Sequence, residues 1–595
     1  MSGKVFLALA ILLGVFSEFS CDDDWWKHMQ LYQIYPRSFK DSNGDGIGDI
    51  RGIIEKLPHL KSIGVDATWL SPIFPSPMKD FGYDISNYYE IAEEYGTIED
   101  LEELIAEAKK LGIRVLLDFV PNHTSDQCEW FTKSVLRDPH YQDYYVWHDG
   151  LEGGTKPPSN WNSVFRGSAW TYNEVRGQWY LHQFLKEQPD LNFRNVRVVA
   201  EMHNVLNFWL EKGVAGFRVD AIPHLIESEV DSDGNYINEP LSGNTDPESY
   251  DYLIHAQTRE RDETYNTVFG WRNTLDAFSK SEANTIGTRV LLMEAMSSTD
   301  LVIKYYGNET TEGAHFPFNF NLAFLNKDAN AIKLRDDIMS WLDAVPDGRV
   351  TNWVVGNHDQ PRVASRFGAD LSDGIIMLGM LLPGVAVTYN GEEIGMENFY
   401  LSWEDTVDPS GCNAGVDLFN STSRDPARTP FQWDNTAFAG FSTEKSWLPV
   451  ATNYKELNLQ KQASDEISPY KLYVSLSELR KKEVIKSGAI EIKAITNNIL
   501  GFRRYLPDED PIITIINTRE TPVSVNVKTH FEGLPNGVKI LAASRSSTRK
   551  TNEYVSTPFT LNAYESLVLT SGVKGLLVSQ FLVVVIALRS IFKLL

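Results

Sequence analysis

Cysteine is scarce in this chain of 595 residues, which contains only Cys21, Cys128 and Cys412. Three cysteines allow at most one disulfide bond within the chain, so a fold that depends on a disulfide framework is excluded. The fold must instead be stabilised by a hydrophobic core, and a hydrophobic content of 42% with 23% charged residues is typical of a globular protein. A chain of this length is expected to form roughly two to four domains.

Positive charge is also in short supply, because 55 Lys and Arg residues face 80 Asp and Glu residues and the formal net charge is -25. An acidic surface repels both the phosphates of nucleic acids and anionic lipid headgroups. We therefore expect no nucleic-acid partner and no electrostatic binding to a membrane surface.

Long apolar runs are missing as well, since no run reaches the about 20 residues that a membrane-spanning helix needs. The run from Val5 to Phe16 follows one lysine, which predicts a signal peptide over residues 1–20; a membrane-anchored N-terminus is the alternative. The run from Leu576 to Leu588 follows the small residues Ser571 and Gly572, which resembles a signal for a glycolipid anchor. A short span or a simple tail is the alternative there. The sequence thus predicts an extracellular protein that is glycolipid-anchored at the plasma membrane, or else secreted.

Short β-branched segments alternate with amphipathic helical segments, such as residues 50–63, 97–111 and 196–212, along most of the chain. Thr97 and Asp100 form a capping-box pattern at the start of the second of these helices. Eight segments are predicted as strands, in the order LYQIYP, DATWLSP, RVLLDFVPNH, GFRVDA, RVLLMEA, HFPFNF, VTNWVVGNHD and VAVTYNGEE. Eight alternating units predict an α/β fold, a (β/α)8 TIM barrel.

Two regions depart from this alternation. After the third strand, a stretch rich in Trp, Gly, Asn and Pro shows no sustained period and is predicted to be an inserted irregular subdomain. Towards the C-terminus, short alternating segments such as IITIINT and VSVNV predict an antiparallel β domain. The predicted division is a signal peptide, a barrel in two parts, the insert, the C-terminal β domain and a removed anchor signal, over 1–20, 21–124 with 196–488, 125–195, 489–570 and 571–595.

Charged residues occur where the predicted barrel strands end. Arg218 and Asp220 lie two residues apart in GFRVDA and therefore face the same side of a strand. Asp118, Glu294 and Asp359 end other strands, and strand ends meet at one rim of such a barrel. A structural ion pair is the simpler interpretation of Arg218 with Asp220 alone. Several carboxyls on one rim instead indicate glycoside cleavage, in which one carboxylate attacks and a protonated one assists the leaving oxygen.

The sequence resembles the α-amylase family of glycoside hydrolases, and within it the membrane-anchored maltases (α-glucosidases) of insects. The resemblance covers roughly residues 25–570. It rests on segments that occur in the family's order: GYDISNY, DFVPNHTS, QPDLN, GFRVDAIPH, LLMEAM, VVGNHDQPR and DPARTPFQWD. The resemblance implies a retaining, exo-acting α-glucosidase that takes short oligosaccharides.

The resemblance also implies roles for single residues. It makes Asp220 the nucleophile, Glu294 the acid/base and Asp359 the third carboxylate, while Asp118 supports the barrel rim. The residues expected to grip the glucose unit are Tyr83, Asp84, His123, Arg218, His358 and Arg428. Ala221 follows the nucleophile, and a small residue there accompanies α-1,4 bonds in related enzymes, which favours maltose-like and sucrose-like substrates.

Two calcium sites are expected, both structural, and the chemistry itself needs no metal. The segment DSNGDGIGD places oxygens at positions 1, 3, 5 and 9 of an EF-hand-like loop, with Gly52 in place of the usual Glu at position 12. The ligands would be Asp41, Asn43, Asp45, the Ile47 carbonyl and Asp49; a plain glycine-rich turn is the alternative. The resemblance implies a weaker second site from Asn122, Asp190 and the His224 carbonyl.

Other features of the surface stay open at this level. Glycosylation sequons begin at Asn122, Asn308 and Asn420, and the first lies inside a motif and is expected to be bare. A second function class is a cell-surface binding protein, either a receptor or a subunit like the heavy chains of amino-acid transporters, which share this architecture. The retained carboxyls argue for the enzyme. Either a monomer or a homodimer is compatible with the sequence.

Overall fold

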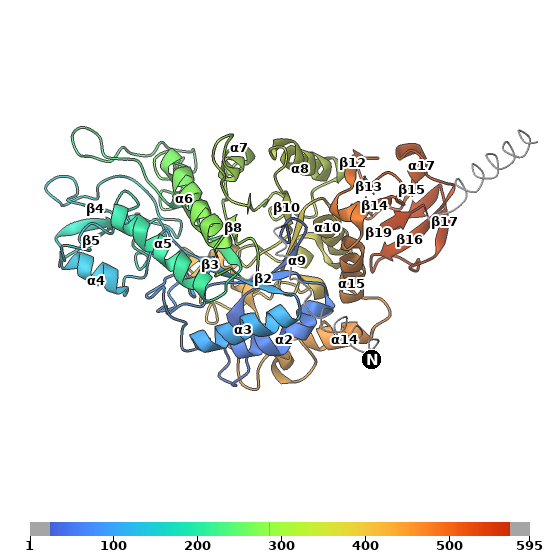
Figure 1. Ribbon diagram of the computed structural model, residues 1–595, viewed down its shortest axis with the longest axis horizontal. Helices are drawn as coiled ribbons and strands as arrows, with labels where there is room; N and C mark the ends of the chain where they lie inside the picture. Colours follow the sequence, from blue (N-terminus) through green and yellow to red (C-terminus); the bar gives the residue numbers. More distant parts are fainter. Residues whose placement is uncertain (1–23, 282, 285, 572–595) are drawn as a thin grey trace, which may run out of the picture.

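A computed structural model describes residues 24–571 apart from 282 and 285 (Figure 1). Its centre is an eight-stranded sheet in the order β10-β11-β1-β2-β3-β7-β8-β9, in which every registered pair is parallel. The predicted barrel is therefore confirmed. Its strands are β1 (Gln30–Ile34), β2 (Ala67–Leu70), β3 (Arg114–Phe119), β7 (Gly216–Val219), β8 (Val290–Met293), β9 (Phe316–Pro317), β10 (Asn352–Val354) and β11 (Val385–Tyr389).

Helices follow the strands and cover the sheet, as parallel strands require. They are α2 (Ile50–Ser62), α3 (Ile98–Lys110), α5 (Val196–Glu211), α6 (Asp262–Ser279), α8 (Ala331–Ala344), α10 (Ala369–Leu381) and α15 (Pro469–Arg480), with only the short α7 (Thr299–Val302) and η4 (Ile303–Tyr306) between β8 and β9. The predicted capping box is present, since Thr97 and Asp100 each accept the backbone N–H of the other.

The barrel closes between β9 and β10 mainly through one side chain. Pro317 in β9 has no N–H to donate to a neighbouring strand. The Asn352 amide bridges the gap, because its Nδ2 donates to the Pro317 carbonyl at 2.6 Å and its Oδ1 accepts from Asn319 N at 2.9 Å. One long backbone hydrogen bond, from Val354 N to the Asn319 carbonyl at 3.4 Å, accompanies it. The predicted sixth strand is consequently very short.

The insert after β3 lies at one end of the molecule, at the left of Figure 1. It contains α4 (Glu129–Val135) and a three-stranded antiparallel sheet, β4 (Trp147–His148), β6 (Gln178–Leu181) and β5 (Trp170–Asn173). Its small core contains Trp161, Trp170 and Leu181. The loop after β7 is tied to the insert, because the Asn160 side chain donates to the Glu239 carbonyl and accepts from Glu239 N. The insert and this loop together overhang the barrel rim.

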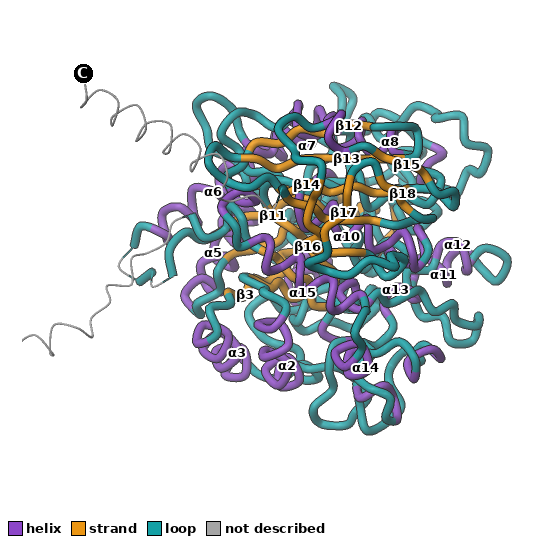
Figure 2. Tube along the Cα trace, turned by 90° about the vertical axis from the view of Figure 1, so that its right-hand side faces the viewer, coloured by secondary structure: helices purple, strands orange, loops and turns teal. Residues whose placement is uncertain are grey.

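The C-terminal part forms a six-stranded antiparallel sheet that Figure 2 shows in front. Its order is β12 (Ala489–Ala494), β13 (Ile499–Tyr505), β14 (Ile512–Asn517), β19 (Ser566–Thr570), β16 (Gly537–Ala543) and β17 (Tyr554–Ser556), and β15 (Val523–Val525) pairs with β18 (Phe559–Leu561) beside it. Arg545 forms an ion pair with Asp373 of α10 at 2.7 Å, and Arg504 donates to the Leu381 carbonyl. These contacts fix the domain to the barrel.

Several sequence predictions concern parts of the chain outside the description. The signal peptide, Cys21 and residues 572–595 of the anchor signal lie outside the described residues. No helix in the described part of the chain is long and apolar enough to cross a membrane. Cys128 is buried and Cys412 exposed, and neither forms a disulfide bond there. Of the sequon asparagines, Asn122 is buried whereas Asn308 and Asn420 are exposed.

Candidate active site

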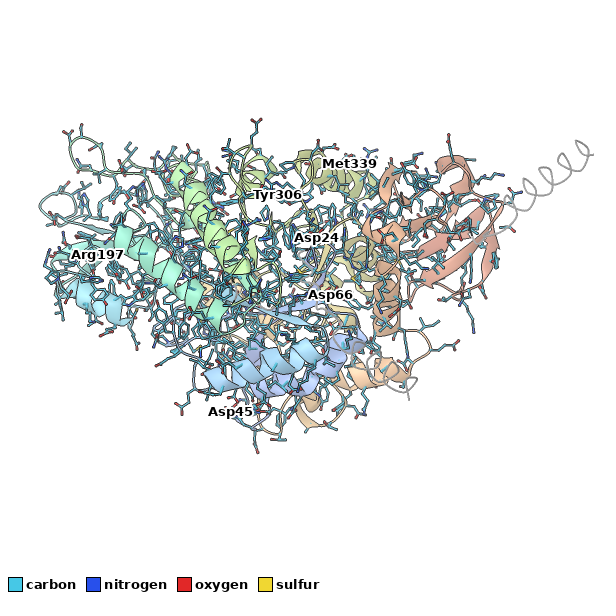
Figure 3. All side chains as sticks on the ribbon, viewed as in Figure 1. Asp24, Asp45, Asp66, Arg197, Tyr306 and Met339 are labelled. Carbon is cyan, nitrogen blue, oxygen red and sulfur yellow. The ribbon has the colours of Figure 1, made fainter. Side chains whose placement is uncertain are left out.

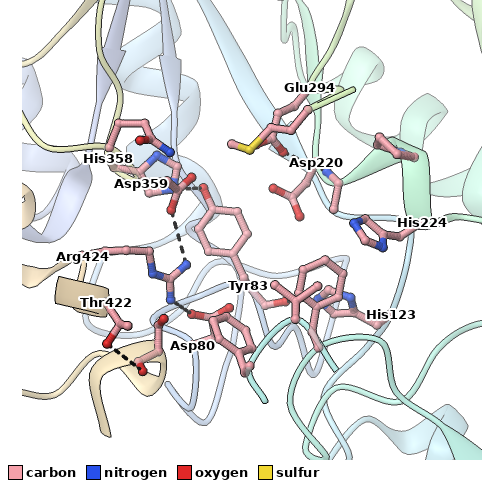
Figure 4. Close-up of a pocket in the computed structure, with 18 of the residues that line it drawn as sticks. Asp80, Tyr83, His123, Asp220, His224, Glu294, His358, Asp359, Thr422 and Arg424 are labelled. Atoms are coloured by element: carbon pink, nitrogen blue, oxygen red, sulfur yellow. Dashed lines mark hydrogen bonds and ion pairs between the residues drawn. The ribbon is translucent and has the colours of Figure 1, made fainter. Parts of the chain in front are cut away.

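A cavity of about 320 Å³ opens at the carboxyl ends of the barrel strands (Figure 4). Asp220 follows β7, Glu294 follows β8, and Asp359 lies five residues beyond the end of β10. All three line the cavity, as do Tyr83 and His123. The rim predicted from the strand ends is therefore where the carboxyls converge. A cavity of this size is at the small end of the range for ligand sites.

Arg218 is the centre of the charged cluster below this cavity. One guanidinium nitrogen, Nη1, lies 2.7 and 2.8 Å from the two Asp118 oxygens and 2.7 Å from Asp220 Oδ1. The other, Nη2, lies 2.9 Å from Glu294 Oε2. Asp220 and Glu294 are thus held on neighbouring nitrogens of one planar group, which fixes their separation. Arg218 lies beneath the cavity wall rather than in it, so it positions carboxyls instead of gripping a sugar.

Desolvation opposes the ionised form of a buried carboxyl, whereas a neighbouring cation such as Arg218 favours it. Burial raises the pKa of Asp118 to about 7, although Arg218 opposes the shift. Burial likewise raises the pKa of Asp220 well above its usual range, with Glu294 and Asp118 acting in the same direction and Arg218 against it. Asp118 and Asp220 therefore hold a proton more tightly than a solvent-exposed carboxyl does, and Arg218 is the group that favours their ionised forms.

Ala221 connects the two carboxyls through the backbone. Its φ of 46° places a non-glycine residue in the left-handed region, which costs about 1–2 kcal/mol. This turn directs Ala221 N to Glu294 Oε2 at 2.9 Å. Arg218 contacts the same oxygen, so both of these contacts are to Glu294 Oε2 and neither is to Oε1. The strained turn thus orients the acid.

Asp359 has a different environment. Arg428 Nη2 donates to Asp359 Oδ1 at 2.8 Å, and Arg424 Nη1 lies 3.3 Å from the same oxygen. Burial alone raises the pKa of Asp359, but the permanent cations Arg428 and Arg424 act against burial, and the pKa lies below its ordinary value. Asp359 is therefore a permanent anion. Arg428 is fully buried and positions Asp359, so it supports the site from outside the cavity.

A hydrogen-bond chain crosses the floor of the site. Gln33 Nε2 lies 2.8 Å from His358 Nδ1, His358 Nε2 lies 2.8 Å from Tyr83 Oη, and Tyr83 Oη lies 3.3 Å from Asp118. Since an amide nitrogen can only donate, His358 accepts at Nδ1 and carries its proton on Nε2. Burial lowers the pKa of His358 well below its usual range, so the ring is neutral. The Tyr83 and His358 rings stack in parallel with centroids 5.5 Å apart.

His123 lines the cavity, and burial lowers its pKa to about 3, which keeps it neutral. The prediction for Asp84 needs correction. Asp84 is absent from the cavity wall, and its oxygens accept from Ser76 Oγ, Lys79 N and Asp80 N. The chain turns sharply between Asp80 and Asp84, because Phe81 and Gly82 have positive φ angles. The Asp84 side chain therefore points back into this turn. Asp80, four residues earlier, lines the cavity instead.

Sequence reasoning missed several residues of the site. Asp80 forms an ion pair with Arg424 at 2.7 Å, which Figure 4 shows as a dashed line. Arg424 also contacts Asp408, and its guanidinium lies 5.1 Å from the centre of the Phe165 ring in the insert. Gln33 could have been found from the sequence, because it is a polar residue inside a strand of buried residues. Arg424 could not, because it lies in a loop and no pattern in the sequence marks it.

The first predicted calcium loop lies at the periphery, where Figure 3 labels Asp45. The donor set is all oxygen, which suits Ca²⁺. However, the Asp41 oxygens already accept from three backbone N–H groups, of Asn43, Gly44 and Gly46. Asp49 caps α2 by accepting from Gly52 N. Among the described residues no group of three or more His, Cys, Asp or Glu side chains is placed to hold a metal ion.

The second predicted calcium site does not fit a cation. Gln183 Nε2 donates to Asp190 Oδ2 and to the His224 carbonyl, each at 2.7 Å, so an amide nitrogen takes the place between the expected ligands. Both partners are acceptors, which fixes the orientation of the amide. Burial raises the pKa of Asp190 to about 8, although its hydrogen bonds with Gln183 oppose the shift. Asn122 Oδ1 is buried without a hydrogen-bond partner among the described residues.

Comparisons with known proteins agree with this geometry. Maltase A1 of Drosophila melanogaster is 46% identical over 559 residues, which covers 92% of this chain and 96% of that protein. Salivary alpha-glucosidase of Aedes aegypti is 47% identical over 538 residues, covering 89% and 92%. The crystal structure of the alpha-glucosyl transfer enzyme XgtA superposes with a TM-score of 0.80 at 30% identity, covering 92% of this chain and 99% of that one.

The alternative class is represented too. An amino acid transporter heavy chain of Homo sapiens is 36% identical over 563 residues, covering 94% of this chain and 79% of that protein. It is less similar than the maltase and the salivary glucosidase. The family model for the alpha amylase catalytic domain matches residues 33–488. The resemblance inferred from the motifs is confirmed, and the chain belongs to the alpha-amylase family.

Proposed function

We propose that this protein is an α-glucosidase that removes terminal α-1,4-linked glucose from maltose and short malto-oligosaccharides, and also cleaves sucrose. The observation that carries the proposal is the Arg218 guanidinium, which brings the Asp220 and Glu294 carboxyls together at one cavity. The relatives named maltase and alpha-glucosidase support the same activity. The protein is then a glycoside hydrolase of the retaining type.

The reaction proceeds in two displacements. Asp220 attacks the anomeric carbon while Glu294 donates its proton to the departing oxygen, which leaves a covalent glucosyl-enzyme. Glu294, now a carboxylate, takes a proton from water, and the resulting hydroxide displaces Asp220 and releases glucose with its configuration retained. Asp359 stays ionised throughout because of Arg428 and Arg424, and it stabilises the positive charge that develops on the sugar ring.

The shape of the cavity favours removal of single terminal units. The Asp80–Arg424 ion pair joins two loops across the cavity wall, and Phe165 of the insert lies against Arg424. Asn413 donates to the Phe165 carbonyl and adds a second tie between the same loop and the insert. Such a closed wall leaves room for one glucose beyond the cleavage point. The small side chain of Ala221 lies directly beside the nucleophile, which supports the preference for α-1,4 bonds.

The decisive experiment measures glucose release by the native protein and by Asp220→Asn from maltose, isomaltose and sucrose in parallel. Native protein should act on maltose and sucrose with little release from isomaltose. The variant should keep its circular dichroism spectrum and lose hydrolysis by about 10⁴-fold or more. Activity of the variant near the native level would falsify the nucleophile assignment. A folded native protein inactive on all three sugars would favour the binding-protein function.

Calcium in the loop from Asp41 to Asp49 is part of the same proposal. The hard oxygen donors Asp41, Asn43, Asp45, Ile47 and Asp49 would hold the ion and brace the turn before α2, away from the chemistry. Removal of calcium with a chelator should lower the thermal midpoint, and Ca²⁺ should restore it. An unchanged midpoint would leave the loop as a plain turn.

The location also belongs to this proposal. A glycolipid anchor would hold the enzyme at the outer face of the plasma membrane, with glycans at Asn308 and Asn420. Treatment of intact cells with a phosphatidylinositol-specific phospholipase should release the activity, and a peptide N-glycosidase should reduce the apparent mass. Activity that stays with the cells would exclude this anchor.

A further inference from the structure

Arg259 lines the catalytic cavity but has no part in the chemistry described so far. Its Nη2 donates to two neutral oxygens, the Met296 carbonyl and Ser297 Oγ. Its Nε is buried without a hydrogen-bond partner among the described residues. No carboxylate of the described chain forms an ion pair with it, in contrast to Arg218 and Arg424. The positive charge of Arg259 is therefore available to a molecule in the cavity.

The loop after β7 holds Arg259 rigidly in this position. The Glu239 carboxylate accepts from Ala256 N and Gln257 N, both at 2.6 Å, and Glu260 N donates to the Pro223 carbonyl at 2.9 Å. The Glu260 carboxylate accepts from Tyr265 Oη at 2.7 Å and from Tyr305 Oη at 2.9 Å. A guanidinium on such a framework loses little entropy when it binds a ligand.

The position of Arg259 relative to the reacting bond follows from its contacts. The proposed function assigns the glucose unit to be removed to the part of the cavity lined by Tyr83, Asp80 and Asp359, on the side of the Asp80–Arg424 pair. Arg259 instead contacts residues 296 and 297, directly beyond Glu294, the acid that serves the leaving oxygen. Arg259 is therefore on the leaving-group side of the scissile bond.

Two apolar residues of the cavity wall lie on this side. The Met296 carbonyl accepts from Arg259, the Pro223 carbonyl accepts from Glu260 N, and both residues line the cavity. A hexose ring has one face of C–H groups and a perimeter of hydroxyls. Apolar walls suit the face, and a guanidinium that lines the cavity without a carboxylate partner suits the hydroxyls.

We propose that Arg259 selects the leaving group of the α-glucosidase, by donating hydrogen bonds to hydroxyls of the second sugar unit while the apolar walls hold its face. This inference rests on the proposed function. It predicts that Arg259 contributes to the cleavage of disaccharides and not to the cleavage of glucosides whose leaving group lacks hydroxyls to accept its hydrogen bonds.

The test compares kcat/KM for maltose and for phenyl α-glucoside in native protein, Arg259→Met and Arg259→Lys. Arg259→Met should lower kcat/KM for maltose by about 10- to 100-fold, as expected for a lost charged hydrogen bond, and change the value for phenyl α-glucoside less than about twofold. Arg259→Lys keeps the charge but lacks the planar guanidinium. Its kcat/KM for maltose should lie between the values of native protein and of Arg259→Met. Arg261→Met, on the same loop but outside the cavity wall, is the matched control and should leave both substrates unchanged.

Each outcome is decisive. Equal losses on both substrates would mean that Arg259 only props the strand end that carries Glu294, and the proposal would be overturned. Unchanged activity on maltose would overturn it as well, and the α-glucosidase function would stand. Native protein inactive on both substrates would overturn the proposed function and with it the role of Arg259. Thermal midpoints of all variants show whether a loss reflects misfolding.

Discussion

Arg424 donates a hydrogen bond of 2.7 Å to Asp80 and thereby ties the loop after β11 to the loop after β2. The two residues are 344 positions apart in the chain, and both line the catalytic cavity. The pair is largely buried, so removal of one partner leaves a charge without its counterion. In the proposed enzyme, this contact closes one side of the cavity, which would otherwise be an open cleft.

Removal of this contact should open the cavity. Asp80→Ala should allow cleavage of malto-oligosaccharides whose terminal glucose is blocked at O4 and O6 by a benzylidene group, which the native enzyme should reject. The same variant should lose about tenfold or more in kcat/KM for maltose, because it lacks a charged group beside the glucose. Product analysis by chromatography measures both. Asp370→Ala, at an exposed site on α10, is the control. Continued rejection of the blocked substrate by Asp80→Ala would show that another group closes the cavity.

Glu294 should matter in proportion to the basicity of the leaving group. Glu294→Gln should lower kcat/KM for maltose by about 10²- to 10⁴-fold, because the departing alkoxide is no longer protonated. For 2,4-dinitrophenyl α-glucoside, whose leaving group needs no proton, the loss should be less than about tenfold. Asp220→Asn should abolish both reactions. Equal losses on the two substrates in Glu294→Gln would assign Glu294 a role other than the acid.

Gln183 takes the place between Asp190 and the His224 carbonyl where a calcium ion was expected. Gln183→Glu replaces the amide with a carboxyl, which removes the two donated hydrogen bonds and puts a second acidic group beside Asp190. The variant should therefore be destabilised by about 3–5 kcal/mol in a chelator, and Ca²⁺ should restore much of that loss. Thermal unfolding of variant and native protein, each with and without Ca²⁺, measures the difference. An equal response to Ca²⁺ in both proteins would contradict this interpretation.

Glu392 gives the fold a pH dependence that can be measured. Both of its carboxyl oxygens are buried, and burial raises its pKa to about 8, although the Tyr389 backbone and Arg366 oppose the shift. Because the folded pKa exceeds the unfolded one, the folded state holds an extra proton between about pH 5 and pH 8. The free energy of unfolding should therefore fall by about 1.4 kcal/mol per pH unit across this window, relative to Glu392→Gln.

Urea unfolding of native protein and Glu392→Gln at pH 5, 6, 7 and 8 tests this expectation. The difference between the two proteins should change steadily up to pH 8 and level off above it. Glu466→Gln, at an exposed ion pair, should run parallel to native protein. Parallel curves for Glu392→Gln would mean that this carboxyl has partners that lower its pKa.

The alternation of strands and helices was sufficient to predict the barrel, because the period of apolar residues changes where the structure changes. The same pattern overestimated the sixth strand, since Pro317 interrupts pairing and Asn352 replaces it. Among site residues, those at strand ends were found from their position, as with Asp220 and Glu294. Asp84 was misplaced because a turn with positive φ at Phe81 decides which aspartate faces the cavity, and no pattern in the sequence specifies that turn.

Contacts between distant segments were beyond prediction for a different reason. Arg424 and Gln183 act through partners that the chain brings together only after folding. Periodicity describes single elements, so it carries no information on such pairs. Arg259 belongs to the same group, because its position depends on how the long loop after β7 is fixed to the insert.

The side chain of Asn352 joins β9 to β10, whereas backbone hydrogen bonds join the other neighbouring strands of the barrel. Backbone pairing joins the eight strands at seven of their contacts. The eighth contact, between β9 and β10, depends chiefly on an amide side chain. Local opening should begin at this contact, so the amide protons of Asn319 and Val354 should exchange sooner than those of β1 or β2. Asn352 lies on β10, and the chain continues from β10 to His358 and Asp359. Movement at Asn352 should therefore also move Asp359, the carboxylate proposed to stabilise the sugar cation.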